Sequence, residues 1–253
     1  MRLNKILSLQ FGFFLIIGLL LASVQSVVFS HDFYTELYAR IRLAQRENIS
    51  EEDLENSLFM MVDYVQSERD DLDGTITWHG QKQETFNTRE KRHMKDVRTL
   101  WQRARLVMIL SWILAVLAAV IILVREGLDG VGLLARGLME GLACFAVVLV
   151  FFGFWWLIDF TGFWTWFHTI VFPGNTDWLL DPATDFMIVI CPEEMFSTMV
   201  FQIAARLIAS LAMFGAIAWL CQKTLPAYRM AEQILMGSRP QPECKAGNPR
   251  QPE

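Results

Sequence analysis

Two of the four histidines in this sequence stand in surroundings suited to proton transfer. Glu90 lies three residues before His93, and Asp96 lies three residues after it. In a helix these side chains share one face, so either carboxylate can hold one ring nitrogen and leave the other free. The spacing suits a general base, and it equally suits a solvated helix that contains one histidine.

The second histidine, His168, is surrounded in sequence by aromatic residues, among them Trp164, Phe167 and Phe172. A lone titratable group among aromatic rings at a membrane surface is costly unless it has a partner. We interpret it either as a functional group or as an interfacial histidine with a backbone partner. The other two histidines, His31 and His79, are interpreted as surface residues.

Other site chemistries lack their sequence signals. The chain has no GxSxG, no HExxH and no glycine-rich phosphate loop, and its four cysteines form no CxxC pair. We therefore expect no metal and no cofactor, and general acid–base chemistry remains. A net charge of -5 without a basic stripe gives no sign of nucleic-acid binding.

The elements that must position these histidines are membrane helices. Hydrophobic residues make up 53% of the chain against 19% charged residues. Four apolar stretches, at about 6–29, 106–124, 142–158 and 197–220, are long enough or nearly long enough to cross a hydrocarbon layer of about 30 Å. The fold class is therefore an all-α membrane protein of about four transmembrane helices. Arg206 lies inside the fourth stretch, either as a functional group or with its guanidinium reaching up to the interface.

The charges of the short connections predict the orientation. Basic residues precede the first stretch, lie between the second and third, and follow the fourth, whereas 159–196 has no lysine or arginine. By the positive-inside rule both termini are cytoplasmic, and all four histidines lie on the extracytoplasmic side. The first apolar run exceeds the length of a cleavable signal, so we interpret it as a retained anchor.

This orientation predicts a division of the chain. We expect a first transmembrane helix at 1–29, an extracytoplasmic cap at 30–105, and three further transmembrane helices within 106–221 with an aromatic extracytoplasmic loop at 159–196. A cytoplasmic tail at 222–253 is expected to be disordered from about 237. Within the cap, patterning favours helices at 32–46 and 51–65 and a strand at 75–78 entering a hairpin at His79-Gly80. Asn87, with Glu90 three residues later, predicts a helix start.

Two segments together resemble a known family. The run FNTREKRHMKDV at 86–97 and the run FHTIVFPG at 167–174, followed by Trp178 and further acidic and proline residues, are similar to the two signatures of the lipoprotein intramolecular transacylases of Gram-positive bacteria. The resemblance covers about 31–220, including the layout of four spans. Thr169 and the proline-rich tail depart from the family pattern, and neither concerns the histidines.

The resemblance implies a reaction, a substrate and a site. Its partners are diacylglyceryl-modified bacterial lipoproteins and membrane lipid, in the plasma membrane. The sn-2 acyl chain moves to the α-amino group of the N-terminal cysteine, which gives a lyso-form lipoprotein. His93 and His168 match the catalytic pair, and we assign them as base toward the amine and acid toward the glyceryl oxygen, or the reverse. No covalent acyl-enzyme is required.

Supporting roles are hypotheses that accompany this assignment. Phe172 and Trp178 would line a slot for acyl chains, while Arg206 or backbone amides near Gly174 would stabilise the oxyanion. Glu90 and Asp96 would orient His93. The sequence carries no signal for a particular oligomeric state.

The assignment also makes a geometric demand. We expect the two imidazoles within about 10 Å of each other, with room for substrate between them. A straight helix from His93 to Leu106 would raise His93 roughly 20 Å above the start of its span, so we expect a bend near Leu100–Trp101, an earlier start to the span, or a cap folded down over the site. Two alternatives stay open: a non-enzymatic membrane sensor or assembly subunit, and a metal-dependent hydrolase with His93, Asp96 and His168 as ligands.

Overall fold

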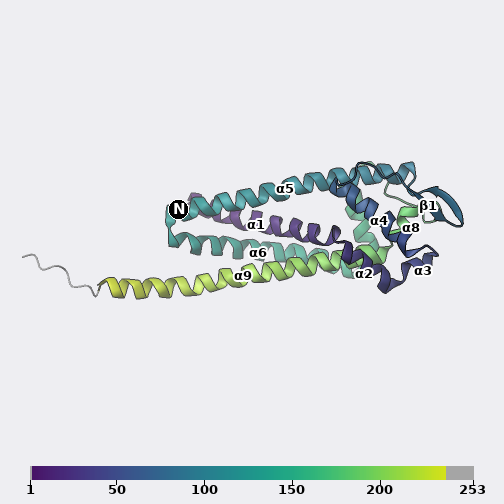
Figure 1. Cartoon of the computed structure of the whole chain (residues 1–253). Helices are drawn as coiled ribbons and strands as arrows, with labels where there is room; N and C mark the ends of the chain where they lie inside the picture. Colours follow the sequence, from purple (N-terminus) through teal and green to yellow (C-terminus); the bar gives the residue numbers. More distant parts are fainter. Residues whose placement is uncertain (1, 238–253) are drawn as a thin grey trace, which may run out of the picture.

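Four long helices run side by side and carry a small folded cap at one end (Figure 1). The computed structural model describes residues 2–237, with backbone alone for residue 2 and for 226–237. The long helices are α1 (Arg2–Val28), α5 (Thr88–Glu126), α6 (Leu128–Ile158) and α9 (Glu193–Gly237). Each contains an apolar window long enough to cross a membrane. The predicted fold class, an all-α membrane protein with four spans, is confirmed.

The long helices have an apolar surface that faces outward, and this surface is what makes them stable in a membrane. Large hydrophobic side chains such as Val116 on α5, Phe154 on α6 and Met213 on α9 are more than half exposed. A hydrocarbon environment accepts such a surface, while the helical backbone satisfies its own hydrogen bonds. On α6 this exposed apolar surface continues to Leu157 and Ile158, the last residues of the helix.

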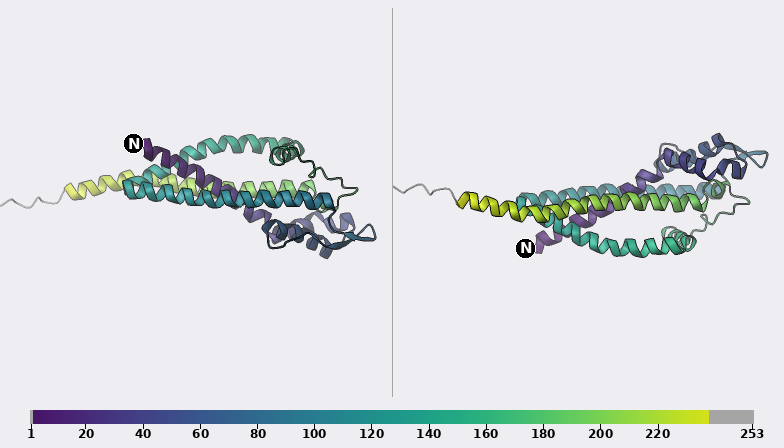
Figure 2. Two further views of the ribbon diagram at one scale, coloured as in Figure 1. Left: turned by 90° about the horizontal axis from the view of Figure 1, so that it is seen from above. Right: turned by 90° about the horizontal axis from the view of Figure 1, so that it is seen from below.

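Helix α1 packs against all three other long helices, and its crossing with α6 is unusually close. A Cβ built on Gly137 would lie 2.1 Å from the carbonyl oxygen of Ser8, and one on Gly12 would lie 2.5 Å from the carbonyl oxygen of Gly137. Gly137 and Gly141 form a GxxxG pattern, the small-residue spacing that lets two membrane helices approach. Beyond this crossing α6 arches away from α5 on its way to the cap (Figure 2).

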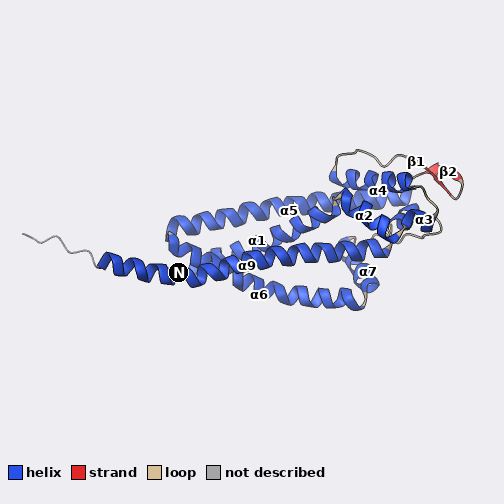
Figure 3. Cartoon of the chain, turned by 60° about the horizontal axis from the view of Figure 1, so that its bottom comes forward, coloured by secondary structure: helices blue, strands red, loops and turns tan. Residues whose placement is uncertain are grey.

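The cap is assembled from two parts of the chain (Figure 3). The first part contains α2 (His31–Ile41), α3 (Leu43–Glu47), α4 (Glu51–Gln66) and the antiparallel hairpin of β1 (Thr75–Trp78) and β2 (Gln81–Glu84). The second part contains α7 (Phe160–Val171) and α8 (Phe186–Ile190). The expected cap helices and hairpin are present, although the helix predicted at 32–46 is interrupted at Arg42, which has a positive φ of 51°.

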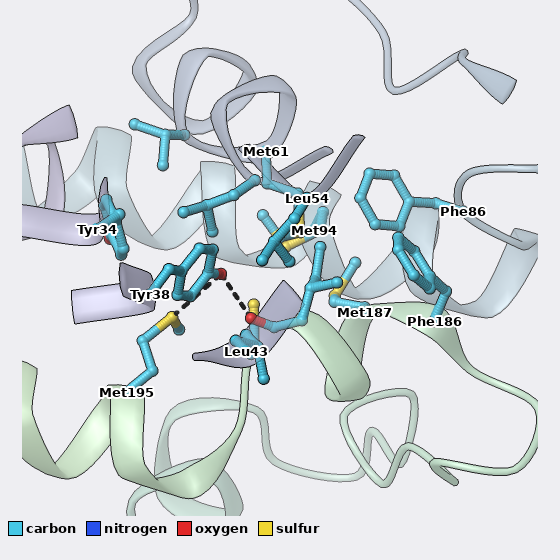
Figure 4. Packing of buried hydrophobic residues seen from close by; sticks show 14 of the residues in the cluster. Tyr34, Tyr38, Leu43, Leu54, Met61, Phe86, Met94, Phe186, Met187 and Met195 are labelled. Carbon is cyan, nitrogen blue, oxygen red and sulfur yellow. Dashed lines mark hydrogen bonds between the residues drawn. The ribbon is translucent and has the colours of Figure 1, made fainter. Parts of the chain in front are cut away.

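One buried cluster joins the two parts of the cap (Figure 4). Phe86 packs against Phe186 at a centroid distance of 6.4 Å, and the Tyr38 hydroxyl donates to the Ile190 carbonyl at 2.5 Å. Both phenylalanines and Ile190 are at most 2% exposed. The segment 186–190, far along the chain, is thereby fixed against the first part of the cap.

Helix α5 runs unbroken from the cap into the membrane. Asn87 caps it, and the Glu90 side chain accepts from the Asn87 backbone N–H in a full capping box, as the sequence predicts. The sequence left open a bend near Leu100–Trp101, and α5 continues as a single helix without a break through both residues. The two parts of the cap instead assemble around the polar first turns of α5. The predicted disorder from about 237 falls almost wholly on 238–253, outside the described residues.

Candidate active site

The imidazole rings of His93 and His168 lie together at the cap. Their centroids are 6.0 Å apart with an angle of 36° between the planes, which confirms the expected separation of less than about 10 Å. The side chains are 9% and 8% exposed. Room for a substrate between the two rings is not present: Phe172 packs against both, at 5.4 Å from His93 and 5.8 Å from His168. A substrate therefore has to approach the pair from one side.

The positions of the two rings follow from their helices. His93 lies in the second turn of α5, thirteen residues before the apolar part of that helix begins at Leu106. His168 lies on α7, the short helix that begins two residues after α6 ends at Ile158. Because the lipid-facing surface of α6 continues to Ile158, the short helix α7 connects that apolar surface directly to His168. The His168 ring, beside that of His93, therefore lies on a helix that directly follows an apolar span.

Aromatic rings enclose His168. Residues four apart on a helix share a face, so Trp164, His168 and Phe172 stand in one row along α7 and its end. The Trp164 ring lies 4.9 Å from the imidazole, and the Trp178 ring lies 5.0 Å from it, centroid to centroid. The segment predicted as an aromatic loop thus builds a wall of rings around one histidine.

A backbone carbonyl fixes the protonation of the His168 ring. Its Nδ1 lies 2.9 Å from the Trp164 carbonyl oxygen, and because a carbonyl only accepts, Nδ1 carries the hydrogen. In the neutral ring Nε2 then has a free lone pair. Burial lowers the pKa of His168, against the smaller opposing effect of the hydrogen bond to Trp164.

The second imidazole is held neutral more strongly. Burial, and then the neighbouring His168, lower the pKa of His93 to about 4, while Asp177 acts weakly in the opposite direction. Desolvation disfavours the charged form of a histidine, and a second imidazole beside it disfavours the charge further. At neutral pH the pair therefore contains two uncharged rings.

The carboxylates expected to orient His93 have other partners in the described structure. Glu90 is 1% exposed, and its two oxygens accept the backbone N–H groups of Asn87 and Met187, each at 2.6 Å. Asp96 accepts from the Asn175 side-chain amide at 2.5 Å. Both carboxylates therefore hold the segment that follows α7, and the orienting roles assigned to them beside His93 lack a direct contact.

This tie between α5 and the segment after α7 is the feature that sequence reasoning missed. Arg92 makes a bidentate ion pair with Asp177 at 2.8 and 2.9 Å, and the Asn87 side chain donates to Asp185 at 2.7 Å. Arg89 donates to the carbonyl of Thr176 at 3.0 Å. A signal was present: the first turns of α5 carry three basic residues, while 159–196 has acidic residues and no lysine or arginine.

The remaining candidates lie elsewhere. Arg206 donates to the Ser26 carbonyl at the end of α1 at 2.6 Å, so its guanidinium is tied to another helix and not to the histidines. His31 pairs with Asp63 at 3.3 Å, and exposed His79 stacks on Trp78. Within residues 2–237 no three histidine, cysteine or acidic side chains are placed to hold a metal ion, so the ligand set of the hydrolase alternative is not assembled.

Comparisons with known proteins agree on one family. The family model described as lipoprotein intramolecular transacylase Lit matches residues 9–196. The chain is similar in structure to the membrane-integral lipoprotein intramolecular transacylase Lit from Bacillus cereus, with a TM-score of 0.72 and 16% identity over 90% of this chain and 99% of that chain. A variant of that protein with one histidine replaced by arginine gives a TM-score of 0.67 and 14% identity over 91% and 95%. A comparison with curated proteins gave no match.

Proposed function

The chain belongs to the lipoprotein intramolecular transacylase family and is an acyltransferase, and from this premise we propose that His93 and His168 catalyse its reaction without a covalent acyl-enzyme. The substrate is a lipoprotein whose N-terminal cysteine carries a diacylglyceryl thioether. The sn-2 acyl chain leaves its ester oxygen and forms an amide with the α-amino group of the same cysteine. The observation that carries the proposal is the pair of buried, neighbouring imidazoles on the short helix after α6 and the first turns of α5.

The reaction is an isomerisation that conserves atoms and protons. The amine nitrogen attacks the ester carbonyl, the resulting tetrahedral intermediate collapses, and the C–O bond to the glyceryl oxygen breaks. One proton leaves the nitrogen, and one proton is gained by the glyceryl oxygen. Since an ester becomes an amide, the transfer is downhill and needs no energy source.

Direct transfer suits the chemistry of this site. Donor and acceptor are on one molecule, and well-oriented intramolecular reactions reach effective molarities of about 10⁵–10⁸ M. Cys191 is not suited to act as a nucleophile. Burial, with Glu90 nearby, raises the pKa of its thiol to about 12, so the reactive thiolate form is suppressed. The site needs to hold the substrate and carry one proton.

The proton path follows from the neutral pair. The free Nε2 of His168 accepts the proton of the attacking amine, which becomes strongly acidic as its bond to the carbonyl carbon forms. The imidazolium then gives this proton to the glyceryl oxygen, directly or through His93 beside it. Proton transfer by positioned groups of this kind contributes about 10²–10⁴-fold to a rate. His168 is thus the base of the first step and the acid of the second, which joins two roles that the sequence had divided between the histidines.

The aromatic wall has a chemical purpose in this scheme. Water that attacked the ester carbonyl in place of the amine would hydrolyse the ester and release a fatty acid. Trp164, Phe172 and Trp178 cover the imidazoles and limit the access of water. Their apolar faces also suit the acyl chains at the membrane surface.

We place the site at the extracytoplasmic face of the plasma membrane. Arg2 and Lys5 begin α1, and Arg125 lies at the junction of α5 and α6, at the end of the bundle opposite the cap (Figure 1). The other end carries the acidic segment 159–196. This charge distribution supports cytoplasmic termini. Diacylglyceryl lipoproteins would then reach the histidines laterally, within the outer leaflet.

Mass spectrometry of lipoprotein N-terminal peptides tests the proposal, in a bacterial host without its own transacylase. Because the transfer leaves the peptide mass unchanged, fragmentation and labelling of free α-amines have to distinguish substrate from product. The intact chain should yield the N-acyl, S-monoacylglyceryl peptide, and His93→Ala or His168→Ala should restore the diacylglyceryl form with a free amine. His79→Asn is the matched control, because His79 is exposed and its positive φ of 51° suits asparagine.

Three results would count against the proposal. Product formation that survives both alanine substitutions would remove the histidines from the mechanism. An acyl chain trapped on the protein after acid quench would establish a covalent route. Loss of activity with a chelator, restored by zinc, would favour the metal-dependent alternative.

A further inference from the structure

We propose that Asn175 is a positioning residue that holds the aromatic wall and the acidic neighbour of the histidine pair in place. Its consequence for the rate rests on the proposed function of the pair, while its effect on the imidazoles does not. Asn175 lies in the segment after α7 and is itself half-buried. Each of its four polar groups makes a hydrogen bond, and each bond leads to a residue at or beside the site.

The two backbone bonds position aromatic rings. The Asn175 N–H donates to the Phe172 carbonyl at 3.2 Å and closes a tight turn over Pro173 and Gly174. Gly174 has φ of 73°, as a type II turn requires at its third position, with proline favoured at its second. The Asn175 carbonyl accepts from the Trp178 indole nitrogen at 2.9 Å. Phe172 and Trp178 are the rings that pack against His168 from the segment that ends α7 and follows it.

The two side-chain bonds position charges. The Asn175 Oδ1 accepts the backbone N–H of Asp177 at 2.7 Å, and this fixes the carboxylate that pairs with Arg92 and acts on His93. The Asn175 Nδ2 donates to the Asp96 carboxylate on α5 at 2.5 Å. Asp96 is one turn from His93 on the same helix, so this last bond anchors the whole segment to the element that carries the second imidazole.

Asn175 is therefore the residue at which four hydrogen bonds meet. The bond to Asp96 involves a charged acceptor, and such bonds are shorter and stronger than neutral ones. Removing it would leave the turn and the indole attached to a segment without its anchor on α5. A displacement of about 1 Å in a positioning element can cost about a hundredfold in rate. Asn175 touches no imidazole itself in the described contacts, so it acts through Phe172, Trp178 and Asp177.

A polarity swap tests the assignment. Asn175→Asp alone sets one carboxylate against another and should break the anchor. The double variant Asn175→Asp with Asp96→Asn exchanges donor and acceptor: the amide now on α5 donates to one oxygen of the carboxylate introduced after α7, and the other oxygen of that carboxylate still accepts the Asp177 N–H. Thr176→Ala is the matched control, because the hydrogen bond from Arg89 uses the carbonyl of Thr176 and not its exposed side chain.

Two readouts are needed. In protein labelled at histidine, NMR should show the His168 ring signals displaced in Asn175→Asp and the pKa of His168 moved up toward about 6.5 as the Trp178 cover loosens. The transfer rate, measured by amine labelling of a lipopeptide, should fall about tenfold to a hundredfold. Both quantities should return toward wild-type values in the double variant and remain unchanged in Thr176→Ala.

The outcomes separate this inference from the proposed function. Histidine signals and rates that are unaffected by Asn175→Asp, or a double variant no better than the single one, would overturn the positioning role. An equal effect in Thr176→Ala would also overturn it, since the disturbance would then be general. If the NMR signals respond and recover as expected while His93→Ala and His168→Ala leave product formation intact, the positioning role stands and the catalytic proposal fails.

Discussion

The rings of His93 and His168 share one buried space, with 6.0 Å between their centroids and Phe172 against both. Burial lowers the pKa of His93, and the neighbouring His168 lowers it further, so the protonated form of this ring is disfavoured twice. A proton that this pair accepts during the reaction is therefore released again readily. That suits a reaction in which a proton is taken from nitrogen and returned to oxygen within one turnover.

The pH dependence of the reaction follows from the neutral pair. Burial lowers the pKa of both histidines, so acidification should protonate the base, His168, only below pH 6.5. The α-amino group of the substrate has an ordinary pKa of about 7.7–8.0 and must be uncharged to attack. The rate at low substrate should therefore rise as pH increases from about 6 to about 9, with the substrate amine as the dominant titration.

A lipopeptide in mixed micelles provides the measurement for this prediction. Replacing its terminal amine by a group with a lower pKa should shift the profile by the same amount toward acid pH. A profile that stays fixed in spite of this change, with its midpoint near about 6.5, would mean that the histidines titrate like exposed ones and that the pair is not protected.

Trp178 provides a second prediction, on the partition between transfer and hydrolysis. Trp178→Ala removes the ring 5.0 Å from the His168 imidazole and admits water, so transfer should fall by about tenfold or more while released fatty acid increases. Trp178→Phe keeps an aromatic face and loses only the bond to the Asn175 carbonyl, so its defect should be smaller. The ratio of free fatty acid to N-acyl peptide measures the effect.

Trp166→Ala is the control for that series. Trp166 is also on α7, is 38% exposed, and packs on Phe152 and Trp155 of α6, away from the histidines. Hydrolysis that rises equally in both alanine variants would assign the effect to the stability of α7 and not to the wall around His168.

The sequence predicted the parts of this site that depend on local pattern. Hydropathy predicted the four spans, the spacing of Asn87 and Glu90 predicted the start of α5, and two short signatures marked the two histidines as candidates. The contacts of Asp96 and Glu90 were not predictable in the same way. Both were assigned to His93 because residues three apart on a helix share a face. In the structure they instead accept hydrogen bonds from donors far along the chain, the Asn175 amide and the Met187 N–H.

The partner of Arg206, within the fourth apolar stretch, was likewise not predictable from the sequence. Its depth in the fourth apolar stretch marked it as an ionisable group that needs a partner. Which partner it meets depends on how α9 packs against α1, and the structure supplies the Ser26 carbonyl near the end of α1. A single sequence encodes such helix pairings only through shape and small-residue patterns spread over several helices.

Glu90 yields a third prediction, on stability. Its two buried oxygens each accept a backbone N–H, from Asn87 and from Met187, and so join α5 to α8. Glu90→Gln turns one of these acceptors into a donor that faces an N–H, which should cost about 1–3 kcal/mol in the free energy of unfolding. Glu84→Gln, at a side chain 73% exposed that pairs with Lys91, should cost about 0–1 kcal/mol.

Unfolding of the two glutamine variants in the same detergent compares them directly. The loss in Glu90→Gln should also loosen the 174–187 segment, so proteolysis there should be faster than in wild type. Equal stability of the two variants would show that the Met187 bond contributes nothing beyond an exposed ion pair.

The crossing of α1 and α6 gives the last prediction. A Cβ at Gly137 would lie 2.1 Å from the Ser8 carbonyl oxygen and 2.4 Å from its carbon, and backbone atoms cannot rotate away as a side chain can. Gly137→Ala should therefore push the two helices apart and lower stability by about 1–3 kcal/mol, with a larger loss for Gly137→Val. Gly153→Ala lies on the same helix with nothing within 4 Å of its added Cβ, so the better helix propensity of alanine should leave it neutral or stabilised by up to about 1 kcal/mol. Because α6 leads directly into α7, separation at Gly137 should also lower the transfer rate, whereas a Gly137→Ala protein as stable and active as Gly153→Ala would show that this close approach is not required.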